Sequence, residues 1–305
     1  MDANVHIPVL LKETLAALAP ALASSSATLV DGTLGGAGHT SAVLARFPSA
    51  RVLACDWDEK ALQAARSKLG EAVKSGRLEF FHGNFARLEE NSATLPPAFA
   101  PPWNAVLLDL GYSSNQLESA EYGMSFQEDA PLDMRLARPA QGTSAWELLQ
   151  ESTESELADI LCAYGEIHGS RRLARKIAEA ARSGELTNST KSLSSLLERI
   201  RKRKGKEGIH PATLVFQALR IAVNDELRNL DHFLEDAILK LKTGGRIAVI
   251  TFHSLEDRVV KRWGQRNSAS LSAVTRKPVT AGEAEIRSNP RSRSAKLRLY
   301  ERNGV

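Results

Sequence analysis

The sequence has 305 residues, 43% of them hydrophobic, which is enough for one large core and a smaller accessory one, so we expect one or two domains. No run approaches the roughly 18 uninterrupted apolar residues that a membrane span requires, and the first residues show no cleavable signal peptide, so we expect a soluble, cytoplasmic protein without a membrane partner. The net charge is only +4, and Cys55 and Cys162 lack the spacing of a metal or redox motif, which favours buried, inert thiols and no disulfide.

Apolar runs and helical patterns alternate in the first part of the chain. After a helix over about residues 8–18, strand-like runs occur at 27–33, 51–58, 78–85 and 105–111, with helical patterns starting near residues 38 and 59. A fifth such strand begins at Arg246, more than a hundred residues later. Near-continuous apolar strands that alternate with helices predict an α/β fold, a doubly wound parallel sheet covered on both faces.

The residues between the fourth and fifth strands are mostly helical in pattern. Helices are expected over about 144–149, 154–163, 170–183, 189–203 and 211–241, the last one stopped by the glycine pair at 244–245. The simplest account is an inserted helical substrate-recognition domain over residues 115–217, with a catalytic core formed by 1–114 and 218–305. The tail offers 271–280 and 295–301 as a final strand pair.

Basic residues gather in two places. Residues 261–305 hold eleven Lys or Arg against three acids, and residues 199–206 hold six Lys or Arg within eight positions. Each cluster alone is also consistent with a solvated helix end. Together they fit a polyanionic partner.

A glycine-rich loop, "VDGTLGGAGHT", joins the first strand to the first core helix. Its glycines let the backbone approach a ligand, and the helix start beyond them supplies unpaired N–H groups; they are Gly32, Gly35, Gly36 and Gly38. Their spacing differs from that of the dinucleotide motif. The loop resembles that of class I methyltransferases, which wraps the amino acid part of S-adenosyl-L-methionine, although a simple tight turn is the alternative.

Polar residues follow the next two strands. Asp56 ends the second strand, where a doubly wound fold places an acid for ribose hydroxyls, whereas Asp58 is better placed to cap the helix that starts at Glu59. Phe85, after the third strand, fits either beside an adenine ring or in the core.

The fourth strand ends in "DLGY", which brings Asp109 to the carboxyl edge of the sheet. Amino-group methyltransferases carry a related motif here: the polar side chain and the next carbonyl, here that of Leu110, accept the N–H bonds of an exocyclic amine, and an aromatic ring, here Tyr112, stacks on the base. Two acceptors help to localise the nitrogen lone pair for in-line attack on a methyl group. A turn cap is the alternative role for Asp109.

The sequence resembles the ribosomal RNA small subunit methyltransferase H (MraW) family over almost its whole length, with "HIPVLLKE", "DGTLGGAGHT", "LLDLGYSSNQLE", "HPATLVFQALRIAVNDEL" and "GGRIAVITFHSLEDR" in family order. The resemblance implies a Rossmann-like class I methyltransferase that uses S-adenosyl-L-methionine to methylate N4 of a cytidine in the decoding region of small-subunit (16S) ribosomal RNA. It also implies a set of cofactor residues that match this chain at Ala37, Gly38, His39, Asp56, Phe85, Asp109 and Gln116. Tyr112, Asn115 and Met124 depart from the usual valine, proline and phenylalanine of the family. Because family members with valine have no ring at that position, the resemblance argues against base stacking by Tyr112.

Two further segments suggest RNA contacts. "GEIHGSRR" carries Glu166, His168, Arg171 and Arg172, whose arginines suit phosphates, and no partner is spaced to make His168 a metal ligand. "TFHSLEDR" looks like a nucleophile motif, but Ser254 and Asp257 read as a capping box, which leaves His253 and Ser254 as lining of the target pocket.

The expected partner is therefore 16S ribosomal RNA in the small subunit or its precursor. The sequence leaves open whether the protein forms a homodimer. A non-catalytic RNA-binding assembly factor with a vestigial cofactor pocket is the main alternative, and an NAD-dependent oxidoreductase is disfavoured by the loop spacing.

Overall fold

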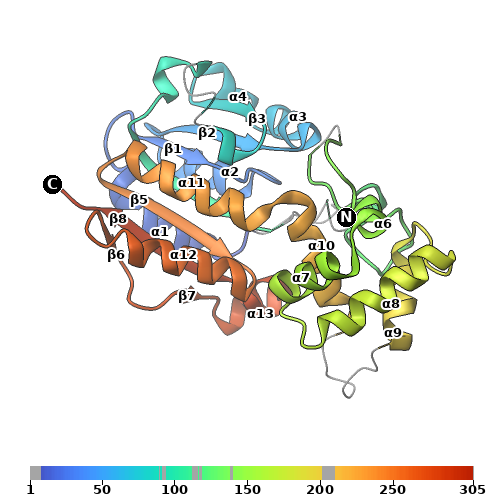
Figure 1. The fold of residues 1–305 in the computed structure, drawn as a ribbon. Helices are drawn as coiled ribbons and strands as arrows, with labels where there is room; N and C mark the ends of the chain where they lie inside the picture. The colour runs from blue at the N-terminus through green and yellow to red at the C-terminus, as the bar shows by residue number, and fades with distance from the viewer. Residues whose placement is uncertain are drawn as a thin grey trace. The chain divides into compact units, whose positions relative to one another are not determined.

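The computed structural model describes residues 8–88, 90, 94–111, 116, 119–137, 140–200 and 210–304. Within them the chain forms two compact units, one made of residues 1–111 and 227–305 and the other of residues 112–226 (Figure 1). None of the helices in the described ranges is both long and apolar enough to cross a membrane.

The first unit is built on one eight-stranded sheet with the order β3-β2-β1-β4-β5-β8-β6, and β7 pairs with β8. The first five strands in this order are parallel, whereas β8 runs antiparallel to β5, β6 and β7. The strands are β1 (Thr28–Asp31), β2 (Arg51–Asp56), β3 (Leu78–His82), β4 (Trp103–Asp109), β5 (Leu241–Thr251), β6 (Leu271–Ala273), β7 (Val279–Thr280) and β8 (Lys296–Arg302). The expected parallel strands and the final strand pairing are confirmed, except that the run over 271–280 forms two short strands, β6 and β7.

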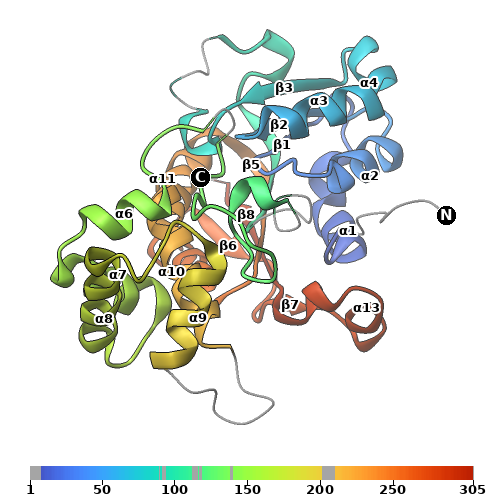
Figure 2. The ribbon, with the colours of Figure 1, turned by 90° about the vertical axis from the view of Figure 1, so that its right-hand side faces the viewer.

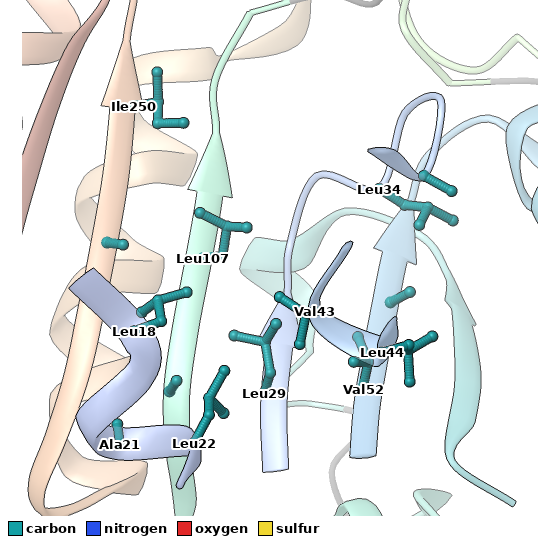
Figure 3. Packing of buried hydrophobic residues seen from close by; sticks show 14 of the residues in the cluster. Leu18, Ala21, Leu22, Leu29, Leu34, Val43, Leu44, Val52, Leu107 and Ile250 are labelled. Carbon is teal, nitrogen blue, oxygen red and sulfur yellow. The ribbon is translucent and has the colours of Figure 1, made fainter. Parts of the chain in front are cut away.

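Helices cover both faces of this sheet, because successive strand residues point to opposite sides. Leu29, Leu107 and Ile250 pack under α1 (Leu11–Leu22), α2 (Gly38–Arg46), α3 (Glu59–Lys68) and the short α4 (Gly70–Lys74) (Figure 3). Their neighbours Val30 and Leu108 pack under α11 (Glu226–Lys240) and α12 (Ser254–Arg266) on the other face. Figure 2 shows α1 and α2 on one side of the sheet and α11 on the other. The remaining helices of this unit are η1 (Phe85–Arg87), η3 (Pro97–Phe99), α13 (Glu283–Ser288) and η5 (Pro290–Ser294).

The second unit is helical in its described residues and has a separate core. Its helices are η4 (Ala120–Tyr122), α6 (Ala145–Glu151), α7 (Glu154–Gly165), α8 (Ser170–Ser183), α9 (Thr190–Ile200) and α10 (Pro211–Asn224). Leu157, Leu161, Leu193 and Leu219 are all completely buried in that core. The unit therefore buries apolar surface of its own and does not depend on the sheet for a core.

Three sequence expectations need correction. The helix expected over 211–241 is broken at Asp225, whose φ of 49° lies in the left-handed region, so α10 and α11 are separate helices and α10 belongs wholly to the helical unit. Helix α11 ends at Lys240, before the glycine pair, because β5 starts at Leu241 through pairing with Trp103 across a bulge. Cys162 is exposed, whereas Cys55 is buried as expected.

Candidate active site

The glycine-rich loop leaves β1 and passes over the carboxyl end of β4. The N–H of Gly32 donates to the carbonyl of Leu107 at 2.9 Å, and a Cβ at Gly32 would lie only 2.5 Å from Cδ2 of Leu108. Gly35 has a φ of 48°, a backbone conformation that favours glycine. These two glycines therefore let the loop turn tightly against the strand end.

Asp31 holds this loop in place through hydrogen bonds, a role that the sequence analysis missed. Its carboxylate is 1% exposed and accepts bonds from the Thr40 hydroxyl at 2.6 Å and from the Thr33 N–H at 3.2 Å. Burial raises the pKa of Asp31, and the bond from Thr40 opposes that rise. The signal in the sequence was an acid at the end of an apolar strand directly before the glycine loop.

Asp56 lies at the end of β2 and contacts the same loop. One of its oxygens accepts from the N–H of Gly35 at 2.8 Å and the other from the N–H of Asp58 at 2.9 Å. Burial raises the pKa of Asp56 to about 6, although these two bonds favour the charged form. Asp58 accepts from the N–H of Lys60 at 2.9 Å and caps α3, which confirms the capping role expected for it.

Asp109 lies on the other side of the loop. Its N–H donates to the Thr33 hydroxyl at 2.6 Å, and its Oδ2 is 3.4 Å from Nε2 of His39, the second residue of α2. Burial of the ring lowers the pKa of His39, but the neighbouring Asp109 carboxylate outweighs it, so the pKa is raised overall. The other carboxylate oxygen, Oδ1, is buried without a hydrogen-bond partner among the described residues.

The loop therefore brings Asp56, Asp109 and His39 to one edge of the sheet. The strand pattern predicted this position for the two aspartates, whereas His39 was expected only from the family resemblance. An unpaired, buried acceptor on Asp109 is costly in a protein interior, and a ligand that donates a hydrogen bond would satisfy it. Together with the turn at Gly35 and Ala37, whose φ is 58°, these groups form a polar edge suited to a small polar ligand.

Two other predicted site residues of the first unit lie in its hydrophobic core. Phe85 is 8% exposed and meets the ring of Phe233 edge-on at 5.1 Å, in the core under α11. Leu110 is also 8% exposed, and its N–H donates to the carbonyl of Ile250 at 3.0 Å. The structure thus gives both side chains a core environment beside the loop.

His253 and Ser254 lie after the carboxyl end of β5. The capping box of α12 is formed by His253 with Glu256, one residue earlier than the expected pair of Ser254 and Asp257. Asp257 instead binds Lys296 and Arg298 of β8, at 3.2 and 2.7 Å. Two basic residues of the C-terminal segment, Lys296 and Arg298, therefore form ion pairs within the first unit.

The remaining predicted residues belong to the helical unit. His168, Arg171 and Arg172 are exposed at the start of α8, and Gln116 is 8% exposed. Tyr112 and most of the basic run at 199–206 lie outside the described residues, and Arg199, the described end of that run, pairs with Glu185 at 2.6 Å.

The sequence of this chain is similar to that of a known protein family. The model of the MraW methylase family matches residues 3–303. The chain is 46% identical to ribosomal RNA small subunit methyltransferase H of Sorangium cellulosum, over 98% of this chain and 91% of that protein. It is also 46% identical to the protein of the same name from Nostoc punctiforme, over 97% and 94% of the two chains.

Among solved structures, an rRNA methylase from Streptococcus thermophilus aligns over 99% of this chain and all of its own, with 13% identity and a TM-score of 0.47. The family match spans both the loop with its aspartates and the helical unit. On that match, this chain belongs to the MraW methylase family.

Proposed function

We propose that this protein transfers a methyl group from S-adenosyl-L-methionine to N4 of a cytidine in the decoding region of small-subunit ribosomal RNA. The observation that carries the proposal is Asp109, whose buried Oδ1 has no hydrogen-bond partner in the described part of the chain and lies at the edge where the glycine loop, Asp56 and His39 meet. The relatives at 46% identity bear the name of a small-subunit ribosomal RNA methyltransferase.

The polar edge fits the proposed cofactor. Asp56 suits the ribose hydroxyls, because a carboxylate that already accepts two N–H bonds still has lone pairs for a diol. The loop from Gly35 to His39 is placed to hold the amino acid part, and Gln116 of the helical unit is a further candidate contact. Bound there, S-adenosyl-L-methionine supplies a methyl group that is activated by a positively charged sulfur.

The role of Asp109 follows from the chemistry of an aromatic amine. The lone pair of the cytosine amine is delocalised into the ring, and acceptors for its N–H groups favour the pyramidal, nucleophilic form. Asp109 and the carbonyl of Leu110 serve as these acceptors. After transfer the nitrogen carries an extra proton, which the carboxylate of Asp109 accepts. Alignment rather than covalent catalysis accounts for the rate.

The target base has to leave its helix, because a stacked amine could not align with the methyl group. His253 and Ser254 are candidates to line the base pocket, and His168, Arg171 and Arg172 are candidates to contact phosphates. The substrate is the small subunit or its precursor. The assembly-factor alternative predicts RNA binding without methyl transfer.

We test the function by incubating small subunits and labelled cofactor with the wild type and with Asp109→Ala. The variant should methylate at least about 100-fold more slowly, because it lacks the acceptor that strengthens at the transition state. Calorimetry with S-adenosylhomocysteine should still detect binding, whereas NAD should not bind. Equal methylation by both proteins would contradict the assignment of Asp109, and no transfer by the wild type would favour the assembly factor.

A further inference from the structure

Residues 8–10, just before α1, lie against the start of α2 next to the candidate active site. Gly38, the first residue of α2, has no room for a side chain, because an added Cβ would come within 2.2 Å of Cγ of Pro8. Val9 is 6% exposed, and Leu10 is completely buried. We call residues 8–10 the strap.

A glutamate from a distant part of the sequence holds the strap. Oε1 of Glu285, in α13, accepts a hydrogen bond from the N–H of Leu10 at 2.7 Å, across 275 positions of the chain. Leu10 has a φ of 53°, a left-handed conformation that is costly for a residue with a Cβ. Such a conformation persists only where the surrounding contacts hold it, and the bond to Glu285 is one of them.

The strap also acts on the ring of His39. Burial lowers the pKa of His39, but Asp109, Asp31 of β1 and the carbonyl of Val9 together outweigh it and raise the pKa overall. Nε2 lies 3.4 Å from Asp109, and neither ring nitrogen makes a well-aligned hydrogen bond to the residues that the structure describes. The ring is therefore placed by its packing and by these neighbouring charges and dipoles, one of which belongs to the strap.

We propose that Glu285 is a positioning residue for methyl transfer, because it holds the strap that keeps the ring of His39 beside Oδ2 of Asp109. This inference rests on the proposed function. A ring beside Oδ2 restricts rotation of the carboxylate, so the buried Oδ1, which has no hydrogen-bond partner among the described residues, stays directed at the polar edge. Alignment of this oxygen with the target amine then depends on a residue that touches neither cofactor nor RNA.

The test compares Glu285→Ala with the matched control Glu283→Ala. Glu283 is two residues earlier on the same helix and is 91% exposed in its pair with Arg287, so its substitution removes a carboxylate without affecting the strap. Glu285→Gln keeps a side-chain oxygen that can accept from the N–H of Leu10. This conservative variant should therefore restore the function that Glu285→Ala loses.

The first readout is the imidazole pKa of His39, measured by NMR on protein that carries ¹³C at Cε1 of its histidines. The variant His39→Gln identifies the resonance. Glu285→Ala should lower this pKa toward the ordinary value, because the ring loses the carbonyl of Val9 and the water that enters weakens its attraction to the nearby carboxylates. Glu283→Ala should leave the pKa unchanged. This measurement requires neither cofactor nor RNA.

The second readout is methylation of small subunits at saturating cofactor. Glu285→Ala should lower kcat about tenfold and leave KM for the RNA unchanged, because the strap affects the alignment of reacting groups and makes no RNA contact. Glu285→Gln should remain within about threefold of the wild type, since the bond to the strap is weakened and not lost. The control Glu283→Ala should equal the wild type.

Both readouts have to change together for the inference to hold. If Glu285→Ala behaves like Glu283→Ala, or if only one readout changes, the strap does not act through His39 and the inference is wrong. Pro8→Ala removes the ring that packs on Gly38, so it should shift both readouts in the same direction, and it covers the case in which Glu285→Ala folds poorly. If the wild type transfers no methyl group, the proposed function fails, and the titration of His39 alone then decides whether the strap positions the ring.

Discussion

Three aspartates at neighbouring strand ends show how single residues define this site. Asp31, Asp56 and Asp109 end β1, β2 and β4, and all three are held by bonds that involve the loop between β1 and α2. Burying carboxylates costs free energy unless hydrogen bonds compensate, so such groups are concentrated where a ligand uses them. Asp31 acts within the protein, whereas Asp56 and Asp109 have capacity left for a ligand.

The raised pKa of Asp56 predicts a pH dependence of cofactor binding. Without ligand this carboxyl has a pKa of about 6 because of burial, and ribose hydroxyls donate to its deprotonated form. Binding should therefore strengthen as the pH rises from 5 to 7 and level off above 7, with an affinity about tenfold lower at pH 5 than on the plateau. Calorimetric titration with S-adenosylhomocysteine at several pH values measures this.

Asp56→Asn is the matched control, because it keeps the size of the side chain and removes the titration. It should bind the ligand more weakly, with an affinity that does not change between pH 5 and 7. If the affinity of the wild type for S-adenosylhomocysteine does not change between pH 5 and 7, the protonation state of Asp56 does not control binding.

The positions of the aspartates at strand ends were easier to predict from the sequence than the residues that contact them. Asp56, Asp58 and Asp109 each follow an apolar run, so their position at a strand end could be predicted from local pattern. The approach of His39 to Asp109 could not, because it depends on the left-handed turn at Ala37. Packing between distant segments determined that contact.

At the level of elements, the same contrast between local pattern and distant pairing recurs. The strands β1 to β5 were predictable because each is a continuous apolar run, but the start of β5 was misplaced by five residues, since pairing with Trp103 extends the strand across a bulge. The break at Asp225 was hidden because apolar periodicity continues on both sides of it. Aspartate tolerates the left-handed conformation better than most residues, so no glycine marked the break.

Asp257 ties α12 to β8 and offers a test of element packing. Its side chain and that of Arg298 are each 14% exposed, and their contact is 2.7 Å. Burial raises the pKa of Asp257, but Arg298 and Lys296 outweigh it and lower the pKa overall. Asp257→Asn should reduce the free energy of unfolding by about 2 kcal/mol at pH 7, as measured by urea denaturation.

The sign of the pH effect follows from the lowered pKa. The stabilisation from Asp257 is present above the pKa of an aspartate in the unfolded chain, about 3.9. It is lost as the pH falls through the lower pKa of the folded state, so the variant and the wild type should converge in acid. Glu283→Gln is the control, because Glu283 is 91% exposed in its pair with Arg287 and should change stability by less than about 0.5 kcal/mol. If both substitutions changed the free energy of unfolding equally, the contact of Asp257 with β8 would add nothing to stability.

At the scale of the whole molecule, the chain leaves the sheet after β4 and returns to it at β5. These two strands are register partners, yet residues 110–240 separate them in the sequence. The helical unit has its own core, and the sheet has two, one on each face. The expected boundary after residue 217 divides α10, whereas the compact unit extends to Glu226, because that helix packs as one piece against α7 and α9.

This organisation predicts that the sheet folds without the insertion. Joining Gly111 to Leu227 through a flexible linker of about ten residues removes residues 112–226 and keeps every strand. The shortened protein should unfold in one cooperative transition in urea, because both cores that flank the sheet remain intact. A broad, non-cooperative transition would show that the sheet depends on the helical unit for its stability.

The same shortened protein separates cofactor binding from RNA methylation. It retains the loop with Asp56 and Asp109 but lacks Gln116, so its affinity for S-adenosylhomocysteine should match that of full-length Gln116→Ala. It should not methylate small subunits, because His168, Arg171 and Arg172, the proposed phosphate contacts, are removed with the helical unit. Full methylation by the shortened protein would place all RNA recognition on the sheet unit, whereas loss of cofactor binding beyond that of Gln116→Ala would show that further residues between 112 and 226 complete the cofactor site.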